Sequence, residues 1–222
     1  MAGIADNLQL TKARIGHASG VTLLAVSKGQ PLERVQEAVA AGQNAFGENY
    51  VQEAVQKMQS MPASFPSLEW HLIGPLQSNK TRAAAERFDW VHTVASEKIA
   101  RRLSEQRPAD LPPLNVLIQV NVSGEASKSG VPADEVADLA KRISKLPRLH
   151  LRGLMAIPEP GADRSRYHAV RTLFDRMKGE FGFDTLSMGM SDDLELAIAE
   201  GATMVRVGTA IFGARKKEKD AA

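Results

Sequence analysis

The stretch Val21-Thr-Leu-Leu-Ala-Val26, which runs into Ser27 and Lys28, is the first of a series of short apolar segments that decide the fold. Most of these segments are rich in β-branched or aromatic residues and lack polar–apolar alternation, as expected of parallel strands covered on both faces. We predict strands at residues 21–27, 45–48, 70–73, 90–94, 115–121, 149–157, 185–188 and 204–207.

Longer amphipathic segments separate these strands. In residues 32–41 the apolar side chains recur at helical spacing, and Gly42 follows as a stop signal. Similar patterns predict helices at residues 133–146, 167–181 and 194–199, and an N-terminal helix at 4–15. Eight strands, each followed by a helix, indicate an α/β protein built as a (β/α)8 TIM barrel with an additional N-terminal helix. The alternative is an open doubly wound sheet, which the same alternation also permits.

The composition is that of a globular protein with a sizeable core, since 43% of the 222 residues are hydrophobic and 24% are charged. We expect one domain over residues 1–222, with its core at about 21–213 and a flexible tail at 214–222. The 28 Lys+Arg and 26 Asp+Glu residues leave a net charge of +2, which argues against a nucleic acid or a membrane as partner.

Missing residue types and segments exclude further classes of protein. The absence of cysteine excludes disulfides, thiolate metal sites and a cysteine nucleophile. No histidine pair at metal-ligand spacing and no carboxylate cluster occurs, so we expect no metal site. There is no long apolar stretch and no secretory signal pattern, and we therefore expect a cytoplasmic protein.

Polar residues gather where the predicted strands end, which is where barrels carry their active sites. Lys28 follows one of the most apolar runs of the sequence, and partial desolvation there would lower its pKa. A neutral amine is what Schiff-base formation with a carbonyl compound requires. The structural alternative is a lysine that simply leaves a strand for solvent.

Glycine-rich turns follow the seventh and eighth strands, where barrels often bind phosphate. We predict that Ser191 opens a helix that begins near Asp192, so that its hydroxyl and nearby backbone N–H groups can hold an anion. Gly208 and Thr209 offer backbone N–H groups and a second hydroxyl. The alternatives are that Ser191 is a helix cap and that Gly208 only permits a turn.

Two charged or titratable side chains lie inside predicted strands. Arg206 needs a fixed partner, because a buried unpaired charge is costly; the partner is either a barrel carboxylate such as Glu48 or a ligand heteroatom. His71 is interpreted as a hydrogen-bonded core or rim histidine rather than a catalytic base. The polar stretch 123–130 is either a mobile loop over the barrel mouth or a plain surface connection.

Six motifs of the sequence resemble those of the pyridoxal phosphate homeostasis protein family: residues 23–28, 46–53, 70–80, 153–158, 186–193 and 205–213. The resemblance implies a barrel similar to the N-terminal domain of alanine racemase that carries pyridoxal 5′-phosphate. It further implies that Lys28 holds the cofactor as an internal aldimine, that Ser191, Gly208 and Thr209 bind its phosphate, that Arg206 faces the pyridine nitrogen, and that Asn49 lies near the ring.

The resemblance also implies a cofactor carrier, with pyridoxal phosphate and apo-enzymes that need it as partners. We expect little catalysis and no catalytic residue, because an arginine at the ring nitrogen disfavours the protonated pyridine on which most such catalysis depends. We also expect a monomer without a second domain to supply another acid or base. The alternatives are a small amino-acid racemase using Lys28 with His71 or Tyr50, and a phosphosugar aldolase using Lys28 as its Schiff-base residue.

Overall fold

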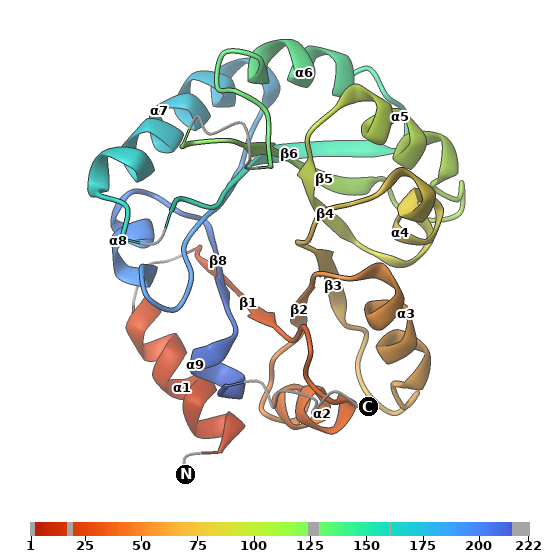
Figure 1. The fold of residues 1–222 in the computed structure, drawn as a ribbon. Helices are drawn as coiled ribbons and strands as arrows, with labels where there is room; N and C mark the ends of the chain where they lie inside the picture. Colours follow the sequence, from red (N-terminus) through yellow and green to blue (C-terminus); the bar gives the residue numbers. More distant parts are fainter. Residues whose placement is uncertain (1–2, 17–19, 124–128, 160, 215–222) are drawn as a thin grey trace, which may run out of the picture.

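The computed structural model describes residues 3–16, 20–123, 129–159 and 161–214. Eight parallel strands form a closed barrel in the order of the sequence, as Figure 1 shows. Their bounds are β1 (Thr22–Val26), β2 (Ala45–Glu48), β3 (Glu69–Leu72), β4 (Trp90–Val94), β5 (Leu114–Val120), β6 (Leu149–Ala156), β7 (Thr185–Ser187) and β8 (Met204–Val207). The predicted barrel is confirmed, and the open sheet is wrong.

Helices surround the barrel (Figure 1). They are α1 (Ile4–Ile15), α2 (Leu32–Ala40), α3 (Val51–Ser60), α4 (Thr81–Arg87), α5 (Glu97–Gln106), α6 (Val136–Ile143), α7 (Arg164–Phe181), α8 (Leu194–Ala199) and α9 (Thr209–Phe212), with a short 3-10 helix η1 (Ser78–Lys80) before α4. The additional helix α1 lies beside α9, where the Asn7 side chain donates to the Ile211 carbonyl at 2.9 Å.

Two predicted helices differ from the observed ones by three residues at one or both ends, and a third, α2, ends one residue earlier than predicted. α7 begins three residues before the predicted start of 167, because the Asp163 side chain accepts the Ser165 N–H at 2.8 Å and caps the helix there. α6 covers 136–143 rather than 133–146, so its first and last predicted turns are not helical. The apolar face on which the α6 prediction rests is nevertheless buried: Val136, Leu139, Ala140 and Ile143.

Pairing between the first and last strands closes the sheet. In this pairing Leu24 is the register partner of Arg206, and Ala25 that of Val207. Alternate side chains then pack on opposite sides of the barrel wall. The large core lies between wall and helices and includes Phe46, Leu72 and Val205, whereas Leu24, Ala45 and Met204 form a separate small cluster.

Parts of two predictions fall outside the described residues. These parts are residues 215–222 of the predicted tail and residues 124–128 of the loop at 123–130. In the portion of the chain that the structure describes, every helix is too short or too polar to cross a bilayer.

Candidate functional site

All six residues predicted to bind the cofactor follow or belong to four consecutive strands of the closed barrel, β7, β8, β1 and β2. Ser191 lies in the turn after β7, Arg206 in β8, and Gly208 and Thr209 directly after β8. Lys28 follows β1, and Asn49 comes directly after β2. Because parallel strands all end at the same rim, this rim, called the mouth below, brings residues from both ends of the sequence into one sector.

Lys28 is half-buried, and both of its neighbours in the sequence are held in place. The buried Ser27 hydroxyl donates to Glu48 Oε1 at 2.6 Å, and the Gly29 N–H donates to Glu53 Oε1 at 2.6 Å. Gly29 has φ +66°, a left-handed conformation that glycine adopts without steric cost. The backbone that carries the Lys28 amine is therefore fixed on both sides.

Lys57 of α3 ties these anchors together. Its ammonium donates to Glu48 Oε1, to Glu53 Oε1 and to the Ser27 carbonyl, each at 2.7 Å. Glu48 is completely buried, and burial raises the pKa of its carboxyl against the opposing effect of Lys57. This cluster, Ser27, Glu48, Glu53 and Lys57, is called the Lys57 network below.

The predicted phosphate residues occupy the sector beside β1. A Cβ on Gly208 would lie 3.1 Å from the Val26 carbonyl oxygen, so the strand ends pack too closely there for a side chain to enter easily. Thr209 is exposed at the start of α9.

The predicted role of Ser191 in opening a helix is wrong in detail. α8 begins at Leu194, and Ser191 lies in a half-buried turn before it. Asp193 shapes this turn, because its carboxylate accepts the Met190 N–H and the Tyr167 hydroxyl. Ser191 is also anchored through its carbonyl, which accepts Arg14 Nη2 at 2.9 Å.

Arg206 is buried in β8, and its suggested pairing with Glu48 is wrong. Its Nη1 donates to the Ser187 hydroxyl at 2.8 Å and its Nη2 to the Ala156 carbonyl at 2.9 Å, while Glu48 pairs with Lys57. Among the described residues no carboxylate lies within ion-pair distance of the guanidinium. Burial lowers the pKa of Arg206 to about 10, against the nearby charge of Asp193.

Two histidines lie behind Arg206 in the barrel interior. Ser187 Oγ is 3.2 Å from His92 Nδ1, and His92 Nε2 is 2.9 Å from His71 Nδ1. His71 Nε2 is 2.7 Å from Glu69 Oε1. Both histidines are fully buried, and burial lowers the pKa of each imidazole.

The sequence favours a hydrogen-bonded core or rim histidine over a catalytic base at position 71, and the structure places His71 inside the barrel with hydrogen bonds. Both of its ring nitrogens already have partners inside the barrel. Tyr50, the other residue considered as a second acid or base, is 65% exposed just after β2.

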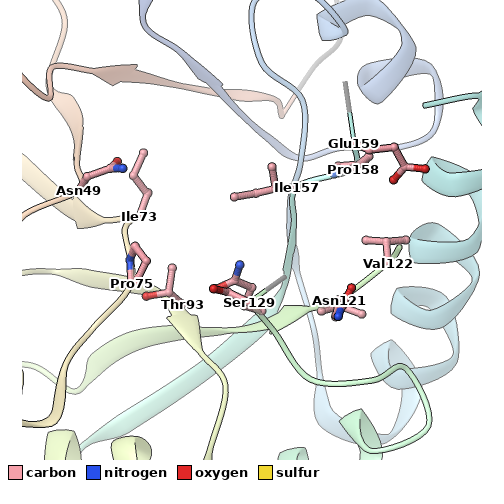
Figure 2. A pocket seen from close by; sticks show the side chains of 12 residues that line it. Asn49, Ile73, Pro75, Thr93, Asn121, Val122, Ser129, Ile157, Pro158 and Glu159 are labelled. Carbon is pink, nitrogen blue, oxygen red and sulfur yellow. The ribbon is translucent and has the colours of Figure 1, made fainter. Parts of the chain in front are cut away.

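A cavity of about 280 Å³ opens at the mouth on the side of β2 to β6. In Figure 2, Asn49 and Ile73 face Ile157 across this cavity, and Asn121 and Glu159 lie on its far side. Asn49 thus lies on the boundary between the cavity and the sector that holds Lys28. A Cβ on Gly74 would come within 2.2 Å of the Asn49 carbonyl oxygen, so only glycine lets the loop after β3 approach Asn49 this closely.

Sequence reasoning missed His92, Ser187, Glu69 and Lys57 as parts of the site. Register alone could have suggested one of them, since Trp90, His92 and Val94 alternate along β4 and therefore share a face. Lys57 gave no signal, because an i,i+4 pair with Glu53 is what an exposed helix face also shows.

Residues 1–216 match the family of the alanine racemase N-terminal domain. Proteins named pyridoxal phosphate homeostasis protein are similar to this chain over nearly its whole length. The protein from Pseudomonas aeruginosa is 57% identical, and the match covers 97% of each chain. The protein from Escherichia coli K12 is 52% identical, and the match covers 99% of this chain and 97% of the relative.

A solved structure agrees with these similarities. PipY of Synechococcus elongatus, determined with pyridoxal phosphate bound, is 37% identical and superposes with a TM-score of 0.85 over 95% of this chain and 100% of the other. Together with the barrel described above, these matches show that the chain belongs to the pyridoxal phosphate homeostasis protein family, whose fold is the alanine racemase N-terminal domain.

Proposed function

We propose that residues 1–222 act as a single domain that binds pyridoxal 5′-phosphate at the mouth and attaches it covalently through Lys28. The protein would then serve in cytoplasmic homeostasis and delivery of the cofactor, as a monomer whose other partners are apo-enzymes. The names of the relatives and the cofactor bound to PipY support this assignment.

The donor set at the mouth fits the chemistry of this cofactor. An amine (Lys28), a guanidinium (Arg206) and an amide (Asn49) come from neighbouring strands, as do the hydroxyls of Ser191 and Thr209. Gly208 is half-buried directly after β8 and has no side chain that could obstruct an anion at its backbone N–H. The observation that carries the proposal is the buried Arg206, which has no carboxylate partner among the described residues and lies in the strand next to the one that leads to Lys28.

The same arginine explains why we propose a carrier with little catalysis. When bound, pyridoxal phosphate supplies an aldehyde and an electron-accepting ring, whose acceptor strength depends on protonation of the ring nitrogen. Arg206 can only donate hydrogen bonds, so it favours an unprotonated nitrogen. His71 is buried with both nitrogens paired, which disfavours the racemase alternative in which it serves as the second acid or base.

The test is an absorbance spectrum of the full chain after incubation with pyridoxal phosphate. We expect a visible band that sodium borohydride abolishes, leaving the cofactor attached to the protein and absorbing in the near ultraviolet. Lys28→Ala should lack both the visible band and the attached cofactor, with an unchanged circular dichroism spectrum. Lys80→Ala is the matched control, because Lys80 is also half-buried. An undiminished band in Lys28→Ala would exclude this lysine as the attachment point.

A second measurement separates the carrier from a racemase. Incubation of the loaded protein in deuterium oxide with several amino acids should leave the α-hydrogen in place. Rapid exchange of that hydrogen would contradict the proposed lack of catalysis without affecting the binding assignment.

A further inference from the structure

Five side chains form a continuous row of hydrogen bonds through the barrel, from Arg206 near the mouth to Glu69 at the opposite end. The row, called the interior network below, consists of Arg206, Ser187, His92, His71 and Glu69. His92 belongs to β4 and Ser187 to β7, which are not neighbours in the sheet, so the 3.2 Å contact between them crosses the interior.

The arginine end fixes the direction of the first link. A guanidinium is a donor only, so Arg206 donates to the Ser187 oxygen. The serine hydrogen is then available for His92 Nδ1, but the serine oxygen keeps a second lone pair, so this end alone does not select the His92 tautomer. His92 is completely buried, and its pKa lies well below the ordinary value because of burial, His71 and Arg206, so the ring is neutral with one protonated nitrogen.

The glutamate end fixes the direction of the remaining links. The hydrogen bond from His71 lowers the pKa of Glu69, so this carboxylate is ionised at neutral pH and can only accept. His71 Nε2 must therefore carry the proton that it donates to Glu69 at 2.7 Å. The neutral His71 then has an unprotonated Nδ1, which accepts from His92 Nε2 at 2.9 Å.

With His92 Nε2 donating to His71, the neutral His92 has an unprotonated Nδ1 that accepts from the Ser187 hydroxyl, so every donor in this arrangement points away from Arg206. The network links a buried cation to a carboxylate that is 46% exposed, through three neutral groups. Aligned hydrogen bonds polarise one another in a low-dielectric interior, so the arrangement compensates the guanidinium charge without a direct ion pair. Transfer of a proton along it would start with deprotonation of a guanidinium, which favours a positioning role over a conducting one.

We propose that Ser187, His92 and His71 are positioning residues that hold the guanidinium of Arg206 at the mouth through a one-way row of hydrogen bonds ending on the Glu69 carboxylate. The inference rests on the proposed function in one respect, namely that Arg206 contacts the bound cofactor. The direction of the network itself does not depend on any ligand.

The first experiment uses the full chain without cofactor. Long-range ¹H–¹⁵N correlation spectra of the imidazoles should show both His71 and His92 as neutral rings protonated on Nε2 at pH 7.5. A proton on Nδ1 of either ring, or a charged imidazole, would overturn the proposal.

The second experiment removes one oxygen atom. Ser187→Ala deletes the acceptor of Arg206 and the donor of His92, whereas Thr185→Val deletes a buried hydroxyl on the same strand that donates to Asp184 instead. In Ser187→Ala we expect a shifted His92 Nδ1 resonance, a displaced absorption maximum of the bound cofactor, and release of the cofactor roughly tenfold faster than from the wild type. Thr185→Val should change none of the three.

The proposed function and the positioning role can be refuted separately. If the wild type acquires no cofactor band, the proposed function fails, while the cofactor-free spectra still decide the direction of the network. If the band and release rate of Ser187→Ala match those of the wild type, the positioning role is wrong even though the cofactor binds. Lower thermal stability with unchanged tautomers and unchanged band would mean that Ser187 has a packing role only, which also overturns the proposal.

Discussion

Replacing Lys57 by methionine tests whether the Lys57 network holds a buried charge in place beneath Lys28. The substitution keeps most of the side-chain volume but removes three hydrogen bonds of 2.7 Å, two of them to carboxylates. Glu53 is 28% exposed and can turn to solvent, but Glu48 is 0% exposed and its Oε2 has no hydrogen-bond partner among the described residues. Glu48 would be left as a buried carboxylate supported by Ser27 alone.

Breaking a buried ion pair by removing one partner costs about 3–5 kcal/mol. We expect a loss of this size in the free energy of unfolding of Lys57→Met, measured by urea titration at pH 7.5. Lys98→Met, at an exposed position of α5, should change it by less than about 0.5 kcal/mol. The double variant Lys57→Met with Glu48→Gln should recover most of the loss, because no charge is then buried alone.

The pH dependence of this loss provides an internal check. Removing Lys57 removes a cause that lowers the pKa of Glu48, so the raised pKa rises further. A folded state whose carboxyl pKa lies above the unfolded value binds a proton more tightly, and stability then increases as pH falls between the two values. The difference from wild type should therefore shrink on mild acidification. A loss below about 1 kcal/mol at pH 7.5, or one that grows towards pH 5, would refute the reasoning.

Three further predictions concern the site and the assembly. Ser191→Ala combined with Thr209→Ala should accelerate release of pyridoxal phosphate by about a hundredfold or more, since each hydrogen bond to a charged oxygen contributes about 1.5–3 kcal/mol. Equal retention in stopped-flow chase experiments would remove both residues from the phosphate site. In ¹³C NMR the pKa of the Glu69 carboxyl should lie below that of an ordinary glutamate, because His71 donates to it. The stability that this carboxylate contributes is then present above its unfolded-state pKa and is lost as pH falls through its folded-state pKa, and His71→Phe should raise the folded-state pKa. Sedimentation equilibrium should give the 24.0 kDa mass of a single chain, and a larger mass at micromolar concentration would contradict the proposed monomer.

Much of the fold follows from local patterns in the sequence. β2, β4 and β8 have the predicted bounds, because each is a short apolar run between clear turn or helix signals. The positions of Lys28, Gly208 and Thr209 after their strands were also predictable, since the ends of parallel strands in a barrel share one rim. The apolar pattern also predicted α8 at residues 194–199, but the prediction that Ser191 opens a helix near Asp192 was wrong. The turn that contains Ser191 depends on Tyr167, a side chain of α7 that contacts Asp193 only in the folded protein.

Periodicity over a few residues is enough to predict which segments become strands and helices and which side chains stand at the strand ends. The partners of the buried charges could not be predicted in this way, because they depend on contacts between strands far apart in the sequence. Arg206 pairs with Ser187 rather than Glu48, and Ser187 meets a histidine 95 residues away. Inward-facing side chains meet those of opposite strands only when β1 and β8 pair and the barrel closes. A local sequence pattern therefore cannot predict which of these side chains will contact each other.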